Sequence, residues 1–571
     1  AETIEGGNSG NTVVPSDHSN SVLYNRITLP ESDQQFMPKN GSPLSQSDID
    51  LIVQWIDEGA LETPVVDYSG PVWYVETNGS DETGDGSEAS PFATIQKGID
   101  LSNDGDTILV ANGIYNQIAA LYDTSRSLLI ASHYIIDNNF DHIANTVIDF
   151  SNNLDGWYFH MDSLFVTGFL FENYIRPYNV LSDSSKYFNL SSSFFKDNSN
   201  GIYLTNGTKV INNCTFTNNG KNNSAYDYSG AVFVNSQNTN VGVDDRTTYL
   251  TMVSCDFYDN IGEQGGGLLF RGEVGYVDSC NFYNNQADQD VGGLNYGDGG
   301  AIANYPETDA NNVLHITNSL FVNNYAYDDG GAIATAENLQ QSIAETNVIN
   351  CTFINNSSLD KGNAFYLSFG SDVTIKNSII TGLSSIEFLD YGSNINQNLS
   401  IDFSSVEGGE GSILGYQSDY MSLSYENSFD LEIVFCDALN NDYSLPENSP
   451  AVGAGENSTN IGALGVGCES LLIDKEIIPE HYTIYQNYPN PFNPITSLRY
   501  DLSEDGLVNI TIYDMMGRTV KTLVNNSQNA GYKSIKWNAT NDRNEPVPAG
   551  MYIYTIQVGE FRQTRKMVLL K

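Results

Sequence analysis

The chain has 571 residues and a formal net charge of −47, from 71 acidic and 24 basic residues. Such an acidic chain repels nucleic-acid phosphates and anionic lipid surfaces, which excludes both as main partners. Hydrophobic residues make up 40% and charged residues only 17%, so this is not a disordered acidic protein, and it can bury a large core. No apolar run reaches the roughly 18 residues of a membrane-spanning helix, and we expect no transmembrane segment.

Residues 1–66 contain one predicted helix. Ser45 can cap its N-terminus, apolar residues recur at helical spacing from Ile49 to Ile56, and Gly59 ends it. This region resembles the C-terminal half of a cytochrome c-type domain in its motifs Met37-Pro38, Leu44-Ser45 and Trp55-Ile56-Asp57-Glu58-Gly59-Ala60. The resemblance implies that Met37 is an axial haem-ligand position. The attachment motif Cys-x-x-Cys-His is absent, so we expect no haem.

Residues 67–471 repeat one pattern of short segments. A Ser or Cys is followed by Phe two residues on and by Asn three residues later, in six copies: Ser193–Asn198, Cys214–Asn219, Cys255–Asn260, Cys280–Asn285, Ser319–Asn324 and Cys351–Asn356. A Gly-rich element separates the copies, as in Gly299-Gly300-Ala301-Ile302. A fixed order of short strands predicts a parallel β-helix, in which equivalent residues stack about 4.8 Å apart.

Three ladders follow from this stacking. We expect the Phe side chains to fill the core and the Asn residues to occupy turns, because Asn tolerates left-handed backbone. The Cys residues share an inward position with Ser, which favours small buried side chains over redox or metal-binding thiols. Cys436 and Cys468 lie outside the ladder and could form a disulfide.

The two ends of this segment indicate a family. Ser90 as N-cap with Pro91 predicts a short helix that covers the first coil with Ile95 and Ile99. This opening resembles pectate-lyase-like right-handed β-helix proteins, and residues 449–465 resemble their last coil. The Gly-Gly and Phe-x-x-Asn repeats resemble bacterial surface adhesins. The resemblance implies a right-handed parallel β-helix over 67–471 and does not identify a substrate.

Residues 472–571 form a separate domain with different electrostatics. They hold 11 of the 24 basic residues and 10 of the 71 acidic ones. Short alternating strands predict an immunoglobulin-like β-sandwich. The motifs Tyr488–Pro494, Ile512–Asp514, Trp537, Ala549–Tyr552 and Lys566–Val568 resemble the C-terminal sorting domain of type IX secretion cargo. That family implies export to the outer cell surface of a Bacteroidetes-like bacterium, with the secretion machinery as a partner through residues 478–571.

The long inter-strand loops are the predicted ligand-binding face, because insertions in a solenoid emerge on one side. Their aromatic and acidic residues are Tyr226, Asp227, Tyr228, Tyr296, Tyr305, Tyr325 and Tyr327, with Asp288, Asp290, Asp298, Asp328 and Asp329 as possible Ca²⁺ ligands. Asp298 and Asp329 each precede Gly-Gly-Ala-Ile, so they should stack. Stacked carboxylates repel unless they are solvated, protonated or bridged by a hard cation. A solvated acidic surface is the alternative.

The sequence predicts an all-β protein: a parallel β-helix, then a small β-sandwich, with a short helical N-terminal segment. We expect a secreted, surface-displayed monomer that binds polysaccharide or acts in adhesion, with Ca²⁺ as a possible cofactor. A polysaccharide lyase or glycoside hydrolase is the alternative. Lyases of the pectate type pair Ca²⁺ ligands with a basic residue, for which Arg246 and Arg271 are the candidates. A structural spacer for a missing N-terminal module is a third hypothesis.

Overall fold

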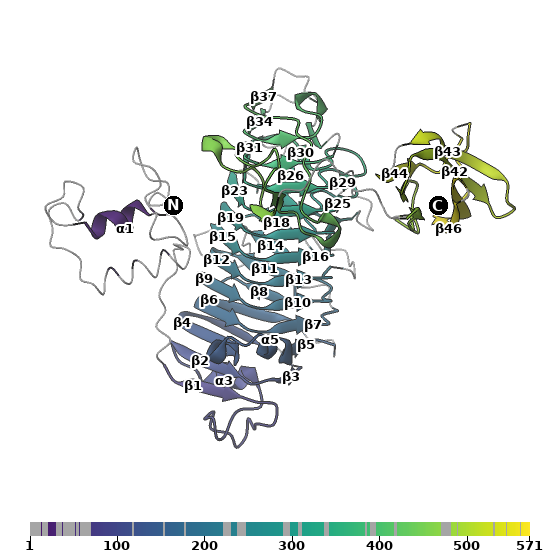
Figure 1. The fold of residues 1–571 in the computed structure, drawn as a ribbon. Helices are drawn as coiled ribbons and strands as arrows, with labels where there is room; N and C mark the ends of the chain where they lie inside the picture. The colour runs from purple at the N-terminus through teal and green to yellow at the C-terminus, as the bar shows by residue number, and fades with distance from the viewer. Residues whose placement is uncertain are drawn as a thin grey trace. The chain divides into compact units, whose positions relative to one another are not determined.

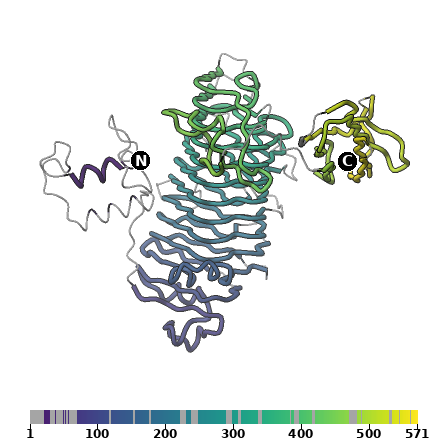
Figure 2. Tube along the Cα trace, viewed as in Figure 1, coloured from purple at the N-terminus to yellow at the C-terminus, as the bar shows by residue number. Residues whose placement is uncertain are grey.

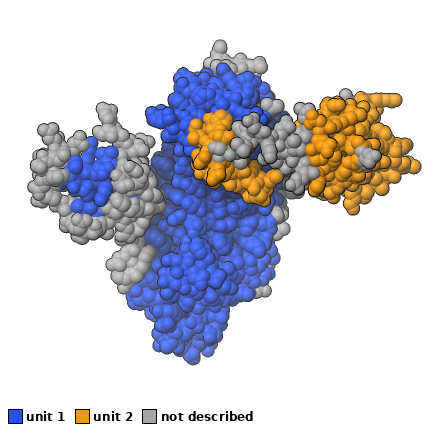
Figure 3. Space-filling model, viewed as in Figure 1, with its two compact units in different colours: residues 1–432, 453–464 blue, residues 433–452, 465–571 orange. Residues whose placement is uncertain are grey.

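The computed structural model describes the chain from residue 70 to 469 and from 481 to 570, apart from short gaps, and little before residue 70. The described positions before residue 70 are 13, 21–29, 37, 49, 52 and 56, and the gaps are 117–118, 152–154, 176–178, 221–229, 237–246, 289–296, 307–310, 336–341, 383–384, 389–395, 416–419, 488, 529–530, 544 and 560. The chain divides into two compact units (Figure 3): residues 1–432 with 453–464, and residues 433–452 with 465–571.

The first unit contains a parallel β-helix, in which successive coils stack on one another along the helix axis (Figure 2). Each full coil contributes strands to three faces, A, B and C, and some coils add a short strand to a fourth sheet, D. The chain runs through them in the order B, A, C, D: β14, β15 and β16 (Figure 1) are followed by β17 of sheet D. All pairings between coils are parallel, for example Leu250↔Gly275↔Leu314 on face A.

The strands are as follows. Face A contains β1 (Val72–Val75), β2 (Asp106–Val110), β4 (Ala120–Ser132), β6 (Trp157–Thr167), β9 (Tyr187–Ser191), β12 (Gly207–Asn212), β15 (Thr248–Val253), β19 (Val274–Asp278), β23 (Asn312–Thr317), β27 (Ala344–Ile349), β31 (Ser371–Lys376), β34 (Gln397–Asp402) and β37 (Met421–Glu426). Face B starts on the first halves of β4 and β6 and continues through β8 (Leu181–Asp183), β11 (Ile202–Thr205), β14 (Val232–Asn235), β18 (Leu268–Arg271), β22 (Ile302–Asn304), β26 (Ile333–Thr335), β30 (Phe365–Leu367), β33 (Ile386–Phe388) and β36 (Ile413–Leu414).

Face C contains β3 (Gly113–Tyr115), β5 (Thr146–Asp149), β7 (Leu170–Glu172), β10 (Phe194–Lys196), β13 (Thr215–Thr217), β16 (Asp256–Tyr258), β20 (Asn281–Tyr283), β24 (Leu320–Val322), β28 (Thr352–Ile354), β32 (Ile379–Ile380) and β35 (Ser405–Val406). Sheet D contains β17 (Ile261–Gly262), β21 (Gln286–Ala287), β25 (Tyr325–Ala326) and β29 (Ser357–Ser358). The helices of this unit are short: α1 (Val22–Ile27), α3 (Ile95–Leu101), α4 (Tyr134–Asp137), α5 (Asp141–Asn145), η2 (Glu410–Ser412) and η4 (Glu456–Ser458).

The phenylalanine ladder is confirmed and fills the core along face C. Neighbouring rings from Phe195 to Phe353 are stacked, with centroids 4.6–5.0 Å apart. The ladder also includes Phe171, which the sequence pattern missed. The four ladder cysteines are free and buried, as expected of small core residues. Burial raises the pKa of the Cys351 thiol to about 12, which keeps it protonated and unreactive.

The asparagine ladder exists, but the predicted reason for it is wrong. The left-handed residue is the one before each ladder Asn, with φ of 52–59° at Asp197, Asn218, Asp259, Asn284, Asn323 and Asn355. The ladder side chains point inward. Asn260 donates through Nδ2 to Asn285 Oδ1 and to Phe216 O, both at 2.9 Å. These amides form a hydrogen-bonded column that satisfies the backbone inside the turn.

The first coil is capped by α3, whose N-terminus differs from the prediction. The helix starts at Ile95, and its N-cap is Thr94, which accepts a hydrogen bond from Lys97 N. Ser90 and Pro91 lie before it. Asp81 holds this turn by accepting from Thr94 N and Oγ1. The helix nevertheless buries Ile95 and Ile99 as expected. The predicted helix from Ser45 lies largely outside the described residues.

The second unit contains an antiparallel β-sandwich with its own core. One sheet is β40 (Thr483–Ile484), β41 (Thr496–Leu502) and β44 (Gly531–Trp537), and the other is β43 (Thr519–Gln528), β42 (Gly506–Asp514), β45 (Gly550–Val558) and β46 (Phe561–Leu569). Trp537 and Tyr554 are buried between them. The unit also contains η3 (Ala438–Asn440), β38 (Leu445–Pro446), β39 (Val466–Cys468) and the disulfide Cys436–Cys468. Among the described residues, no helix is long and apolar enough to span a bilayer.

Candidate functional site

The candidate site lies at the turn from sheet D into face B, here called the D–B corner (residues 297–301, 327–332 and 359–364). Asp298, Asp329 and Lys361 occupy equivalent positions in three successive coils. Gly299 N donates to Asp329 O at 2.9 Å, and Gly330 N donates to Lys361 O at 2.9 Å. Gly299 and Gly330 both have φ of +69°, a left-handed conformation that favours glycine. The Gly-Gly element therefore turns the chain so that the preceding side chain stands at the corner.

Three carboxylates meet at this corner. Asp298, Asp328 and Asp329 each offer an oxygen, and these oxygens lie within 4.8 Å of one another. Asp298 is only 3% exposed and Asp329 6%, whereas Asp328 is half-buried. The stacking of Asp298 and Asp329 predicted from the repeat is thus present.

The two buried carboxylates also have a structural role. Asp298 Oδ1 accepts from Asp329 N at 3.1 Å, and Asp329 Oδ1 accepts from Lys361 N at 2.9 Å. Each carboxylate therefore satisfies the backbone amide of the equivalent residue in the next coil. Asp328 has no corresponding place in this chain of hydrogen bonds, so it is the member of the cluster best suited to a ligand.

Burial raises the pKa of Asp329 to about 6; Lys361 opposes the shift and Asp328 adds to it. Burial also raises the pKa of Asp328, helped by Asp360. Lys361 Nζ lies 4.0 Å from Asp329 Oδ2 and 2.9 Å from Asp360 Oδ2. At neutral pH the cluster is therefore a close group of negative charge with one ammonium beside it, which suits a bound cation or a hydroxyl-rich ligand.

Two predicted tyrosines lie on strand β25 of sheet D or directly after it, just before Asp328 in the chain. Tyr325 and Tyr327 are half-buried, as is Asp288. Tyr327 N donates to Ala287 O at 2.8 Å, which places Tyr327 in the coil after Asp288 at the equivalent position. Burial raises the pKa of Tyr325, and the Asp288 carboxylate adds to the shift. The corner therefore contains four predicted site residues, Asp298, Tyr327, Asp328 and Asp329, and Tyr325 and Asp288 lie on or next to the strands of sheet D that lead into it.

Tyr305 was predicted to belong to the ligand-binding face, but the structure buries it. It is 5% exposed and donates its hydroxyl to Asp298 Oδ2 at 2.9 Å. It packs in an apolar cluster on the outer side of face B with Phe233, Leu269, Ala303, Ala334, Tyr366 and Phe369. Because its ring is covered by these neighbours, Tyr305 orients a carboxylate instead of contacting a ligand.

The remaining predicted residues fall into two groups. Arg271 donates through Nη2 to Gln264 Oε1 at 3.0 Å, and its guanidinium lies 5.8 Å from the Phe233 ring centroid. Met37 is 40% exposed, and its backbone N donates to Arg26 O. The others lie outside the described residues: Tyr226, Asp227, Tyr228, Arg246, Asp290 and Tyr296.

Sequence reasoning missed two features. The first is Lys361, which precedes Gly362-Asn363-Ala364, a variant of the Gly-Gly element. Its place in the column of Asp298 and Asp329 could have been found by extending the alignment one residue.

The second feature lies on the outer side of face A. There Tyr276 is 40% exposed and stacks on His315, with ring centroids 4.9 Å apart and planes at 14°. The outward-facing residues of face A can be identified from sequence only after the bounds and register of its strands are known.

Comparison with known proteins gives one family match. Residues 495–560 match the FlgD Ig-like domain. No curated protein matches the chain.

Among solved structures, a rhamnogalacturonan lyase is 15% identical, over 59% of this chain and 88% of that chain, with a TM-score of 0.39. An endo-xylogalacturonan hydrolase from Aspergillus tubingensis is 12% identical, over 70% and 99%, with a TM-score of 0.31. PorZ, an essential surface component of the type-IX secretion system of Porphyromonas gingivalis, is 16% identical, over 16% and 12%, with a TM-score of 0.12. These weak likenesses carry no argument about function, which rests instead on the D–B corner.

Proposed function

We propose that this is a secreted, surface-displayed protein that binds polysaccharide at the D–B corner. The observation that carries the proposal is the cluster of the Asp298, Asp328 and Asp329 carboxylates, together with the half-buried Tyr325 and Tyr327, which come just before Asp328 in the chain. Aromatic faces pack against the apolar faces of sugar rings, and carboxylates accept hydrogen bonds from their hydroxyls. Asp298 and Asp329 come from successive coils, so the carboxylates are spread along the helix, which suits an extended chain of sugars.

We propose Ca²⁺ as the cation of this site. Calcium prefers 6–8 oxygen ligands at about 2.3–2.6 Å, and carboxylate oxygens within 4.8 Å of one another can share one such ion. Asp328 would supply its whole carboxylate, and Asp298 and Asp329 the lone pairs left by their backbone hydrogen bonds. The ion would neutralise the cluster and could bridge to an acidic sugar.

The calcium proposal is tested by calorimetry and by thermal shift with Ca²⁺ on the full chain. We expect binding heat and a rise in melting temperature, both lost in Asp328→Asn. That substitution keeps the backbone hydrogen bonds made by Asp298 and Asp329. Asp442→Asn, in the second unit, is the matched control and should bind as the wild type does. Absence of heat in the wild type would contradict the proposal.

The glycan proposal is tested by affinity electrophoresis in gels cast with different polysaccharides. Tyr327→Ala should lose most of the retardation, because the ring is the apolar platform. Tyr276→Ala removes an exposed ring from face A, away from the corner, and should be retarded normally. If the two variants exchange these behaviours, the binding face is A and not the D–B corner. If no polysaccharide retards the wild type, the spacer hypothesis gains support over binding.

A polysaccharide lyase is the second candidate, and Lys361 is the observation that favours it. Its Nζ lies 4.0 Å from Oδ2 of Asp329, whose pKa burial raises to about 6, so an amine that acts as a base once it has given up its proton lies beside a carboxyl of intermediate acidity. Ultraviolet absorbance of unsaturated uronate products should rise if this is correct, and Lys361→Ala should abolish the rise. Reducing-end assays on the same panel test hydrolysis. Flat traces in both assays leave binding as the function.

We also propose that residues 478–571 direct export by the type IX secretion machinery. The support is a β-sandwich with its own core, carrying the sequence motifs given above. Deletion of residues 478–571 should leave the β-helix inside the cell. Normal appearance of the truncated protein on the cell surface would refute this proposal.

A further inference from the structure

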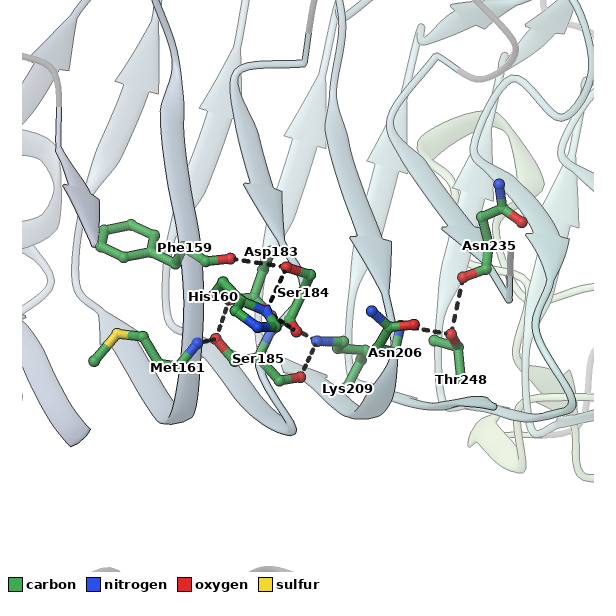
Figure 4. Close-up of polar contacts among 10 residues, drawn as sticks. All are labelled: Phe159, His160, Met161, Asp183, Ser184, Ser185, Asn206, Lys209, Asn235 and Thr248. Carbon is green, nitrogen blue, oxygen red and sulfur yellow. Dashed lines mark hydrogen bonds and ion pairs between the residues drawn. The ribbon is translucent and has the colours of Figure 1, made fainter. Parts of the chain in front are cut away.

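A lysine and an aspartate face each other inside the β-helix, away from the D–B corner. Lys209 is on β12 of face A, and Asp183 is the last residue of β8 on face B. Lys209 Nζ lies 2.6 Å from Asp183 Oδ1, and both side chains are completely buried (Figure 4). The pair joins two successive coils, and its residues are 26 positions apart.

Lys209 lies at a position where the neighbouring coils place apolar core residues. In the stacked coils its neighbours in register are Phe188 and Leu250, and both belong to the apolar core. The ammonium also lies 5.9 Å from the Phe188 ring centroid. Removing an ammonium and a carboxylate from water costs several kcal/mol each, which their attraction only partly offsets. The neighbouring coils have apolar side chains at this position. An apolar residue would therefore pack here without the free-energy cost of burying two charges.

The surroundings of the pair are arranged around the carboxyl group. Ser185 N donates to Asp183 Oδ1 at 3.0 Å, and Ser185 Oγ donates to Oδ2 at 2.8 Å. Ser185 O accepts from Lys209 Nζ at 2.7 Å, and Met161 N fixes the Ser185 hydroxyl at 2.9 Å (Figure 4). Both carboxyl oxygens thus accept a hydrogen bond from Ser185, and such donors stabilise negative charge developing on a carbonyl oxygen.

We propose that Lys209 and Asp183 condense into an isopeptide bond that covalently joins two coils of the β-helix. Nζ forms a bond to Asp183 Cγ, and one carboxyl oxygen leaves as water. The ammonium loses two protons, both of which end on the departing oxygen. The ion pair therefore becomes a neutral amide plus one water, and no oxidant or other reactant is required.

The interior favours this reaction in three ways. The amine and the carboxyl are held in contact, and fixed reactants of this kind reach effective concentrations of about 10⁵ M or more. Burial lowers the pKa of Lys209, against the opposing effect of Asp183, which favours the neutral amine that can attack. The product also removes two charges from a dry core. In a solenoid, where each coil contacts only its neighbours, a covalent link between coils prevents their local separation.

The mass of the purified full chain tests the proposal. We expect it to be lower than the sequence mass by one water, in addition to the two hydrogens of the disulfide. Trypsin should no longer cleave after Lys209, and a branched peptide should join residues 183 and 209. Lys209→Arg should restore the lost water. Lys186→Arg is the matched control, since Lys186 lies the same 2.6 Å from Asp162 but is exposed; this variant should keep the wild-type mass deficit.

Three outcomes would overturn the proposal. The first is a wild-type mass without loss of water. The second is a loss of water that maps elsewhere, for example to a succinimide at an Asp-Gly pair. The third is a loss of water that persists in Lys209→Arg. The wild-type peptide map decides the matter even if the Arg variant does not fold.

Discussion

The asparagine column predicts a large difference between two conservative substitutions. Asn260→Asp changes a buried ladder residue, and Asn284→Asp changes an exposed turn residue in the next coil. Asn284 has φ of 53°, and the equivalent turn residue Asp259 has φ of 54°, so aspartate already occupies this conformation in the same molecule. The substitution at 284 should therefore cost less than about 0.5 kcal/mol.

The cost at Asn260 follows from its hydrogen bonds. An aspartate loses the two Nδ2 donations, to Phe216 O and Asn285 Oδ1, and places an oxygen against both of these acceptors. Two lost hydrogen bonds and a buried, unpaired carboxylate together cost about 3–5 kcal/mol. Local opening of the coil should then be roughly a hundred- to several-thousand-fold more frequent, at tenfold for about every 1.4 kcal/mol.

The assay is hydrogen–deuterium exchange of peptides that cover residues 255–285, each variant being compared with wild type at the same pH. The buried carboxyl has a folded pKa above its unfolded value of about 4. Its penalty is therefore small below pH 4 and grows as the pH rises toward the folded pKa. The Asn260→Asp effect should shrink on acidification. Equal acceleration in both variants, or an Asn260→Asp effect that grows in acid, would refute the argument.

Three further predictions concern the core, the D–B corner and the disulfide. Phe257→Ala should destabilise the β-helix by about 3–5 kcal/mol in denaturant titration, because its ring is stacked on both sides, whereas Phe140→Ala at a 57% exposed position should be nearly neutral. The pKa of Asp329 is raised to about 6, so its ionisation costs stability as the pH rises from about 4 to 6. Asp329→Asn should therefore gain melting temperature relative to wild type across that window, and a constant difference would contradict the burial argument. Reduction of the Cys436–Cys468 disulfide, with its separation of 32 residues, should destabilise the second unit by about 3–4 kcal/mol, measured by unfolding with and without reductant; unchanged unfolding would contradict this estimate.

Stacking makes much of this fold readable from sequence. Once Phe216 and Phe257 are aligned, every residue at the same offset must lie one strand spacing away, whatever the length of the loop between them. This logic found the phenylalanine ladder, the buried cysteines and the neighbouring positions of Asp298 and Asp329. It placed the asparagine column but not its orientation. Turn propensity alone does not distinguish Asn260 from the left-handed residue that precedes it.

The candidate site was less predictable, because it depends on what covers a side chain. Tyr305 and Tyr327 were both assigned to the long loops, but Tyr305 is buried against face B and Tyr327 is half-buried directly after a strand of sheet D. Whether such a ring is buried depends on the path of the loop that carries it. The alternation of inward and outward residues along a strand does not predict that path. Lys361 was missed for a different reason: its copy of the Gly-Gly element has diverged, and the alignment stopped at Gly362.

The Lys209–Asp183 pair inside the β-helix was also beyond prediction from the repeat pattern. Alternation along β12 would have placed Lys209 inward, between Phe188 and Leu250, and an inward lysine demands a partner. The partner could not be named from the pattern, because Asp183 ends a strand of face B and reaches Lys209 only across the corner between faces B and A. Residues on one face are related by register, whereas residues on two faces are related by the geometry of the corner. The contact between Lys209 and Asp183 could therefore be found only from the three-dimensional structure, although each residue of the pair was visible in the sequence.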